Sequence, residues 1–260
     1  MPNQNNNILV TGSSRGLGRG ITIELAKGGY SVAINYAGNQ VAAEETKSIC
    51  EESAQSNEQK FHIYQADISD SNQRKNMLEK INNEMGILNG LVNNAGIAPK
   101  ERADIMDASE ESFLELVKTN LMGPYFLTQE VSKSWVNNKK EALSKVIFVT
   151  SISSHTASVN RGDYCISKAG LSMAVQLWAS RLAAEEIQVY ELRPGIMKTD
   201  MTSSVTSKYD QLIEDGLVPQ KRWGTPEDLG LAVRSLMDGN FPFSTGTVID
   251  IDGGFNIRRL

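Results

Sequence analysis

Residues 8–18 read Ile8-Leu9-Val10-Thr11-Gly12-Ser13-Ser14-Arg15-Gly16-Leu17-Gly18, and this stretch decides the fold. The apolar run from Ile8 to Val10 is typical of a buried β-strand, and the apolar spacing from Ile21 to Ala26 is typical of a helix. Gly12 permits a tight turn, Gly16 lets a pyrophosphate approach the backbone, and Gly18 lets the helix pack closely on the strand. Because free amides at a helix N-terminus bind phosphates, the stretch predicts a dinucleotide-binding unit.

Six further short runs rich in β-forming residues follow and alternate with longer helical patterns. They cover residues 31–35, 61–65, 90–93, 146–150, 188–192 and 247–251. Strands of a parallel sheet are buried on both faces and are nearly continuously apolar, as residues 146–149 are. The alternation predicts one α/β domain over residues 1–260, with a doubly wound parallel sheet of about seven strands and helices on both faces. Ligands of such sheets bind at the carboxyl ends of the strands.

Tyr164 and Lys168 stand one helical turn apart, shortly after a strand-like run that leads into Ser151. A free tyrosine has a pKa of about 10, so its phenolate is scarce at neutral pH. The Lys168 ammonium on the same helix face favours the phenolate, and the Ser151 hydroxyl can bind the same oxygen or the substrate's. Lowering the pKa by about three units takes roughly 4 kcal/mol, more than a surface lysine supplies. The pattern therefore predicts a proton-transferring tyrosine beside a bound cationic cofactor ring in a dry cleft.

With these motifs in this order, the chain resembles the short-chain dehydrogenase/reductase superfamily over nearly its whole length, and in particular the 3-oxoacyl-[acyl-carrier-protein] reductases. The segments that carry the resemblance are Thr11 to Gly18, Asp67, Asn93-Asn94-Ala95-Gly96, Asn120, Ser151, Tyr164, Lys168 and Pro194-Gly195-Ile196-Met197-Lys198-Thr199. The resemblance implies a Rossmann-type fold in which Ser151 polarises a carbonyl, Tyr164 transfers the proton, Lys168 also holds the nicotinamide ribose, and Asn120 anchors a proton-relaying water. Ser153 and Ser154 lie close by, and Ser151 is preferred because its separation from Tyr164 is the family's usual one.

The resemblance also implies the residues that hold the cofactor. They are Gly12, Ser14, Arg15, Gly16, Leu17, Gly18, Asn35, Tyr36, Asp67, Ile68, Asn94, Ala95, Gly96, Tyr164, Lys168, Pro194, Gly195, Ile196 and Thr199. An NAD site places a carboxylate at the end of the second strand, which would repel a 2′-phosphate. Residues 34–37 contain no acid, and the Arg15 guanidinium can meet a phosphate, so NADP(H) is preferred over NAD(H). The alternative is that Arg15 is an exposed turn residue and Asn35 binds a 2′-hydroxyl.

For the substrate, the resemblance implies a carbonyl compound, with a 3-oxoacyl thioester first and a sugar, polyol or other secondary alcohol as the alternative. A catalytically silent nicotinamide sensor is a remote alternative, because Tyr164 and Lys168 are both present. Residues 199–218 resemble the family's substrate lid and read alternatively as a packed surface helix pair. Lys133, Lys139, Lys140 and Arg181 form either a docking surface for an acidic carrier protein or a solvated face. Relatives assemble through helices like those expected near residues 111–137 and 164–185, which implies a homotetramer or a homodimer.

Composition limits the remaining possibilities. A net charge of −5 over 260 residues argues against a broad nucleic-acid-binding surface. The polar N-terminus lacks the features of a secretory signal, and no apolar run is long enough to span a membrane, so the expectation is a cytoplasmic protein without a membrane partner. Cys50 and Cys165 suggest neither a disulfide framework nor a metal site.

Overall fold

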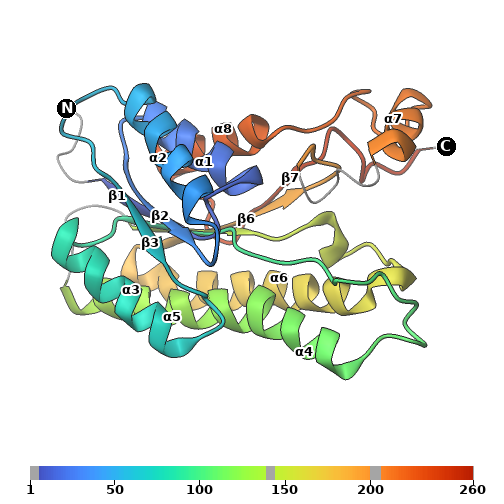
Figure 1. Ribbon diagram of the computed structural model, residues 1–260, viewed down its shortest axis with the longest axis horizontal. Helices are drawn as coiled ribbons and strands as arrows, with labels where there is room; N and C mark the ends of the chain where they lie inside the picture. Colours follow the sequence, from blue (N-terminus) through green and yellow to red (C-terminus); the bar gives the residue numbers. More distant parts are fainter. Residues whose placement is uncertain (1–5, 139–143, 200–205, 260) are drawn as a thin grey trace.

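Seven parallel strands form one sheet in the order β3-β2-β1-β4-β5-β6-β7 (Figure 1). The computed structural model describes residues 6–138, 144–199 and 206–259. Its strands are β1 (Asn7–Val10), β2 (Ser31–Tyr36), β3 (Phe61–Gln65), β4 (Gly90–Asn93), β5 (Lys145–Val149), β6 (Gln188–Pro194) and β7 (Val248–Ile251). The predicted fold class is confirmed, and each predicted strand agrees with an observed one to within about two residues.

The strand order reverses between β1 and β4, which creates the switch point of a doubly wound sheet. From β1 the chain moves outward through β2 and β3, then returns to β4 and continues outward to β7. Loops at the carboxyl ends of β1 and β4 therefore diverge to opposite faces and leave a crevice between them. The glycine-rich turn follows β1 at this point, and the Asn-Asn-Ala-Gly segment begins within β4.

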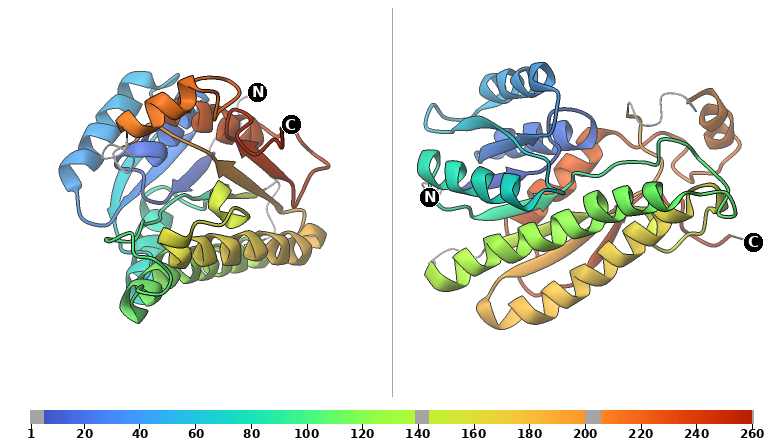
Figure 2. Two further views of the ribbon diagram at one scale, coloured as in Figure 1. Left: turned by 90° about the vertical axis from the view of Figure 1, so that its right-hand side faces the viewer. Right: turned by 60° about the horizontal axis from the view of Figure 1, so that its bottom comes forward.

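Two layers of helices cover the sheet (Figures 1 and 2). One layer contains α1 (Gly16–Lys27), α2 (Gln40–Ser53) and α8 (Pro226–Met237). The other contains α3 (Ser71–Glu84), α4 (Glu110–Val117), α5 (Gly123–Asn138) and α6 (Gly162–Leu182). Each layer has its own apolar core: Ile21 and Leu25 of α1 pack on one face, while Leu127 of α5 and Leu171 of α6 pack on the other. Short helical turns occur at η1 (Lys118–Met122), η2 (Ile152–Ser154), η3 (Val159–Arg161) and η4 (Ala183–Glu185).

The glycine-rich turn has the geometry that its residues predict. Gly12 and Gly16 have φ of +61° and +57°, a conformation that other L-residues rarely adopt. A Cβ on Gly18 would overlap the Gly12 carbonyl oxygen, so only glycine lets α1 begin this close to the turn. The Asn94 carboxamide donates to the Thr11 and Gly12 carbonyls at 2.9 and 3.2 Å and ties the turn to the segment after β4.

Beyond the carboxyl ends of the strands lies α7 (Thr206–Glu214), at the right of Figure 1. The predicted lid, residues 199–218, includes α7, whereas its residues 200–205 lie outside the described part of the chain. Ile213 and Val218 are buried, so this segment packs on the body of the molecule through apolar side chains. Its role as a lid remains a prediction.

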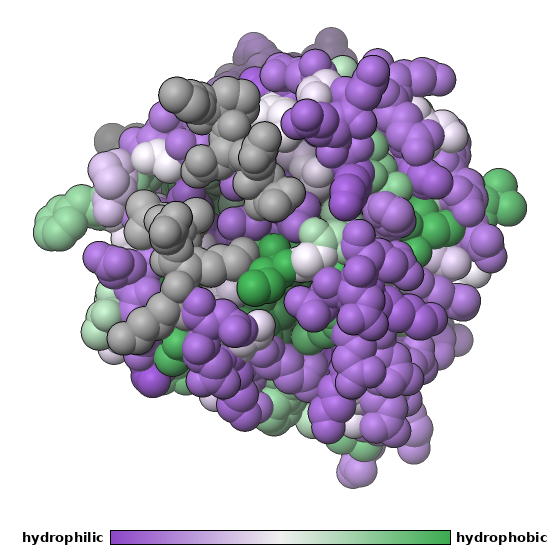
Figure 3. Space-filling view, turned by 90° about the vertical axis from the view of Figure 1, so that its left-hand side faces the viewer, coloured by the Kyte–Doolittle hydropathy of each residue, from purple (hydrophilic) through white to green (hydrophobic). Residues whose placement is uncertain are grey.

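The end of the molecule opposite α7 is mostly hydrophilic, with only a limited hydrophobic area (Figure 3). No helix in the described ranges combines the length and apolarity that crossing a bilayer requires. The features that distinguish the molecule therefore gather at the carboxyl ends of the strands.

Candidate active site

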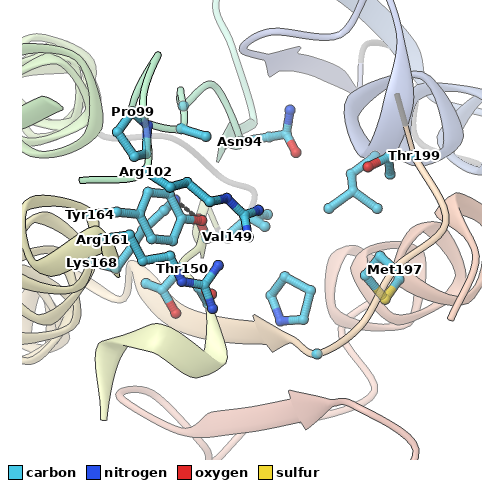
Figure 4. Close-up of a pocket in the computed structure, with 16 residues that line it drawn as sticks. Asn94, Pro99, Arg102, Val149, Thr150, Arg161, Tyr164, Lys168, Met197 and Thr199 are labelled. Atoms are coloured by element: carbon cyan, nitrogen blue, oxygen red, sulfur yellow. Dashed lines mark hydrogen bonds between the residues drawn. The ribbon is translucent and has the colours of Figure 1, made fainter. Parts of the chain in front are cut away.

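Ser151, Tyr164 and Lys168 lie in one pocket at the carboxyl ends of the central strands (Figure 4). Ser151 follows β5, whereas Tyr164 and Lys168 lie on consecutive turns near the start of α6. Of the three serines considered from the sequence, Ser151 lines the pocket and Ser153 and Ser154 do not. The full lining is Leu17, Asn94, Gly96, Ala98, Pro99, Arg102, Val149, Thr150, Ser151, Arg161, Tyr164, Lys168, Pro194, Gly195, Met197 and Thr199.

Lys168 is a buried cation held by the strand beneath it. Its Nζ donates to the Val149 carbonyl at 3.1 Å, drawn as the dashed line in Figure 4, and lies 5.8 Å from the centre of the Tyr164 ring. The side chain is 4% exposed. Burial lowers the pKa of Lys168 to about 8, and the nearby Glu191 carboxylate partly opposes this shift. The ammonium therefore sits where its charge is poorly hydrated and acts strongly on its neighbours.

The pKa of Tyr164 is raised, chiefly by burial, although contact with the Ser151 hydroxyl and the charge of Arg161 lower it in part. The protein's own charges therefore do not bring the pKa of Tyr164 down, because dehydration of the phenol outweighs them, and the predicted lowering by a bound cationic cofactor ring stays a prediction. Burial also lowers the fraction of Lys168 that is protonated near neutral pH, because its pKa falls to about 8. Tyr164 is accordingly protonated at neutral pH and able to donate to an oxygen that gains negative charge.

Asn120 lies in η1, a π-helical turn that joins α4 to α5. Such turns often occur at functional sites, because the extra residue redirects side chains and frees backbone groups. The Asn120 carboxamide accepts from the Ile97 amide at 2.8 Å and donates to the Ser167 hydroxyl at 3.1 Å. A Cβ on Gly96 would lie 3.2 Å from Asn120 Oδ1 and 3.4 Å from Lys168 Nζ, so these two groups flank the same glycine. Asn120 therefore lies beside Lys168, and its role in anchoring a proton-relaying water stays a prediction.

The remaining half of the crevice fits a dinucleotide. Helix α1 begins after Arg15 without a side-chain cap and without an acidic residue in its first turn, so its amides are available to phosphates. A Cβ on Gly16 would meet no atom within 4 Å, which leaves the backbone approachable, as a pyrophosphate requires. The Arg15 side chain is exposed at this end, and so is Asp67 after β3. These groups would hold a bound nicotinamide dinucleotide, whose ring would reach Tyr164 and Lys168.

The side chains of three predicted cofactor residues, Asn35, Ile68 and Ile196, do not line this pocket, and contact of their backbone groups with a cofactor stays a prediction. The Asn35 carboxamide accepts from the Gly12 amide at 3.1 Å and donates to the Ala66 carbonyl at 3.0 Å, so it braces the turn and is not available to a ribose. Ile68 is 3% exposed and packs in the core below the sheet. Ile196 lines a separate cavity near Asp250 and Asp252. The sequence could not show this, because it reveals the order of residues but not which way each one faces.

The pocket also contains residues that the sequence motifs did not single out. Arg102 and Arg161 line it beside Tyr164. Below it, Glu191 of β6 is fully buried and accepts from the Thr150 hydroxyl at 2.7 Å, the Ser172 hydroxyl at 2.8 Å and Arg193 at 2.7 Å. The sequence did offer one signal for this network: Glu191 and Arg193 lie two residues apart in a mostly apolar strand. Because a buried charge requires a partner, this spacing predicts an ion pair.

Comparisons with known proteins agree with this geometry. A family model described as enoyl-(acyl carrier protein) reductase matches residues 12–256. The chain is 32% identical to the 3-oxoacyl-[acyl-carrier-protein] reductase of Staphylococcus epidermidis, over 96% of this chain and 98% of that protein. The chain belongs to the short-chain dehydrogenase/reductase superfamily. Members of this superfamily are NAD(P)-dependent oxidoreductases, and the predicted enzyme class is confirmed.

Two other relatives show that this similarity does not by itself define the substrate or the cofactor. The chain is 31% identical to the L-rhamnose 1-dehydrogenase (NADP(+)) of Thermoplasma acidophilum, over 97% of this chain and 96% of that one. A 3-oxoacyl-[acyl-carrier protein] reductase from Brucella melitensis, solved in complex with NAD, has a TM-score of 0.92 at 38% identity and covers 99% of this chain and 100% of its own. Short-chain dehydrogenases/reductases of this similarity therefore include enzymes named for different substrates and cofactors.

Proposed function

We propose that the protein is an NADP(H)-dependent oxidoreductase that interconverts a carbonyl compound and a secondary alcohol, with a 3-oxoacyl thioester as the leading substrate. The convergence of Ser151, Tyr164 and Lys168 in one pocket beside a dinucleotide-binding turn carries this proposal. A catalytically silent sensor would not need a buried ammonium held against a tyrosine. Burying such a cation lowers stability, so its presence beside a tyrosine favours a functional role.

In the reducing direction, the substrate carbonyl oxygen lies between the Tyr164 and Ser151 hydroxyls. A reduced nicotinamide, when bound in the crevice, would supply the hydride to the carbonyl carbon. Ser151 donates a hydrogen bond to the oxygen, and Tyr164 transfers its proton to that oxygen as negative charge develops. The raised pKa of Tyr164 keeps it protonated for this step, and the Lys168 ammonium then stabilises the phenolate that remains. Asn120 lies beside Lys168 and can return a proton to the site through a water.

A 3-oxoacyl thioester is supported by the relatives named for that reaction, and the apolar Met197 and Pro99 provide walls for an acyl chain. The resemblance to an L-rhamnose dehydrogenase favours a sugar or other polyol as the second candidate. A carrier protein as the physiological donor is supported less directly. Lys133 is exposed, whereas Arg181 already pairs with Glu185 at 3.1 Å, and Lys139 and Lys140 lie outside the described residues.

NADP(H) is supported by the exposed Arg15 and by the absence of an acidic residue at the end of β2. Since Asn35 braces the turn, it offers no competing contact for a ribose 2′-hydroxyl. The NAD found in the Brucella melitensis relative belongs to that protein, and it marks NAD(H) as the alternative.

The assignment is tested by a reduction screen over acetoacetyl thioesters, keto-sugars and simple ketones, with NADPH and NADH, using wild-type enzyme and Tyr164→Phe. Loss of the phenol should lower kcat by about 100-fold or more while cofactor affinity changes little, since proton transfer contributes about that much. Tyr64→Phe, which removes a hydroxyl bonded to Glu84 far from the pocket, is the matched control. A Tyr164→Phe enzyme that keeps a tenth of wild-type turnover would contradict the proposal.

A further inference from the structure

The walls of the pocket are positively charged in an acidic protein. The chain carries a net charge of −5, yet the pocket is lined by Arg102, Arg161 and Lys168 and by no aspartate or glutamate of the described chain. Lys168 is needed by Tyr164 and by the cofactor ribose. The proposed proton transfer assigns no contact to the two arginines, although the charge of Arg161 lowers the pKa of Tyr164 in part. A cluster of cations on a concave wall attracts anions, because the surrounding protein focuses the field into the opening.

Arg161 is the closer of the two to the reacting groups. It ends η3, immediately before α6, and its backbone amide donates to the Ser158 carbonyl at 3.2 Å, which fixes the start of the side chain. Its guanidinium carbon lies 5.7 Å from the centre of the Tyr164 ring, and its charge lowers the pKa of Tyr164. Arg102 comes from the segment between β4 and α4 and lines the same pocket. Figure 4 shows both guanidinium groups pointing into the open centre of the pocket.

Neither guanidinium is neutralised by the described part of the chain. The nearest acidic residue in sequence to Arg161 is Asp163, which accepts from the Ser112 hydroxyl at 2.6 Å and from the Tyr164 amide at 2.7 Å. Near Arg102, Asp104 accepts from the Met106 amide at 3.0 Å, and Glu115 pairs with Lys100 at 2.9 Å. No described carboxylate lies within ion-pair distance of either arginine. Two guanidinium groups that point into one pocket match the hydrogen-bonding geometry of a carboxylate or a phosphate.

The position of the arginines limits where the anion sits on the substrate. A carbonyl oxygen that receives the Tyr164 proton must lie within hydrogen-bond reach of the phenol. Since Arg161 lies against the same ring, its partner must be only a few bonds from the carbonyl carbon. The phosphate of a pantetheine arm is too far along the chain to serve, because the whole arm separates it from the thioester. An anion attached to the reacting skeleton itself fits.

We propose that Arg102 and Arg161 bind a carboxylate that the substrate carries close to its carbonyl, so that the enzyme reduces oxo acids to hydroxy acids. This inference rests on the oxidoreductase function proposed above, and it names a free oxo acid, instead of the thioester, as the substrate class. The step balances: the carbonyl carbon takes the hydride of the reduced nicotinamide, the oxygen takes the Tyr164 proton, and the carboxylate is unchanged. A 3-oxo acid keeps the 3-oxoacyl skeleton of the relatives, with the carboxylate in place of the thioester. A phosphate ester close to the carbonyl offers the same chemistry from another source.

The test compares acids with their uncharged methyl esters. Pyruvate, acetoacetate and levulinate, each paired with its methyl ester, are assayed with NADPH on wild type, Arg161→Gln, Arg102→Gln and Arg258→Gln, the last removing an exposed arginine elsewhere. For at least one pair, kcat/KM should be roughly ten- to a hundred-fold higher for the acid, as a charge-assisted bond implies. Arg161→Gln should remove that preference, Arg102→Gln should reduce it, and Arg258→Gln should leave it unchanged. Dihydroxyacetone phosphate against dihydroxyacetone reports on a phosphate as the source.

The outcomes separate this inference from the proposed function. Equal rates for acids and esters in wild type, or equal losses for both in Arg161→Gln, would overturn it while leaving the oxidoreductase intact. An effect of Arg161 through the Tyr164 pKa alone would also lower both rates together. Binding of each acid and ester to Tyr164→Phe with NADPH, measured by calorimetry, reports on the arginines without turnover. If calorimetry shows no preference for acids, the inference about the arginines is overturned. If acids bind selectively but no substrate turns over in any assay, the result counts against the proposed reaction alone.

Discussion

At the scale of single residues, Lys168 has two opposite effects on the protein. In the proposed reaction its charge stabilises the Tyr164 phenolate, yet burial of that charge lowers stability. The fixed contacts around it limit this penalty: Val149 accepts its hydrogen bond, and Glu191 provides a buried negative charge held by Thr150, Ser172 and Arg193. Glu191 therefore helps to keep Lys168 protonated. The cost of burying Glu191 is offset by four hydrogen bonds from these three side chains, as a buried charge requires.

The effect on stability depends on pH. The pKa of Lys168 is about 8 in the folded protein and about 10.5 when unfolded. Between these values the unfolded chain binds more protons, so the free energy of unfolding rises with pH across this window. Lys168→Met has no such term. Its stability relative to wild type should therefore fall by on the order of 2 kcal/mol between pH 7 and 9.5, measured by urea unfolding. A difference independent of pH would show that Lys168 is not dehydrated in the folded state.

Arg15 provides the residue-scale prediction for the cofactor. Arg15→Ala should raise KM for NADPH roughly ten- to a hundred-fold and KM for NADH only slightly, because only NADPH carries the phosphate. Initial rates with both cofactors at a fixed substrate concentration measure this. Lys47→Ala, which removes a partly exposed lysine paired with Glu51 on α2, is a suitable control. If both KM values rise together, Arg15 shapes the turn without distinguishing the cofactors.

At the scale of elements, helices α1 and α8 pack closely because each has a glycine where they cross. A Cβ on Gly230 of α8 would lie 2.6 Å from the Gly20 carbonyl oxygen of α1, and a Cβ on Gly20 would lie 2.5 Å from Pro226. The two backbones therefore approach closely across these glycines. Because α1 presents its amino end to the crevice, this crossing also fixes the direction in which the phosphate-binding amides point.

Gly230→Ala should therefore destabilise the protein although alanine is the better helix former. Alanine gains about 1 kcal/mol in helix propensity, whereas overpacking against backbone costs about 1–3 kcal/mol, and the Gly20 carbonyl cannot move aside as a side chain would. Gly170→Ala in α6 is the matched control, because its Cβ would meet only the end of the Leu121 side chain at 2.9 Å. Thermal unfolding should show a lower Tm for Gly230→Ala and no decrease for Gly170→Ala. A loss in both would point to a general sensitivity to added methyl groups.

For the whole molecule, much of the architecture could be predicted from the sequence and part of the site could not. Each strand has its own apolar run and the glycine motif marks the first crossover, so strand number, order of elements and fold class were accessible. The side chains that brace the turn, such as Asn35, could not be distinguished from those that face a ligand. Arg161 was missed because its significance comes from its closeness to Arg102, which is distant in sequence and adjacent only in the folded chain. The raised pKa of Tyr164 likewise depends on burial that no local pattern reports.

The apolar face of the α4, α5 and α6 layer supports the expected homotetramer or homodimer. Ile166, Met173 and Leu177 of α6 are each about half exposed, and Phe113 and Leu114 of α4 are also exposed. Figure 2 shows α5 and α6 running side by side on this surface. A double variant, Met173→Glu with Leu177→Glu, should shift the native mass measured by light scattering toward the monomer. Leu231→Glu on α8, in the other layer, should leave it unchanged. A wild-type monomer would contradict the expectation directly.

The low pKa of Lys168 also changes its reactivity as a nucleophile. At pH 7.5 an ordinary lysine is uncharged in about one molecule in a thousand, whereas a pKa of about 8 leaves roughly a quarter of the amines uncharged. Small amine-selective reagents that fit the pocket, such as formaldehyde with a borohydride, should therefore modify this side chain at a pH where most other lysines are inert. A bound dinucleotide would shield it. The extent of modification would then report occupancy of the crevice by mass spectrometry, with no need for a known substrate.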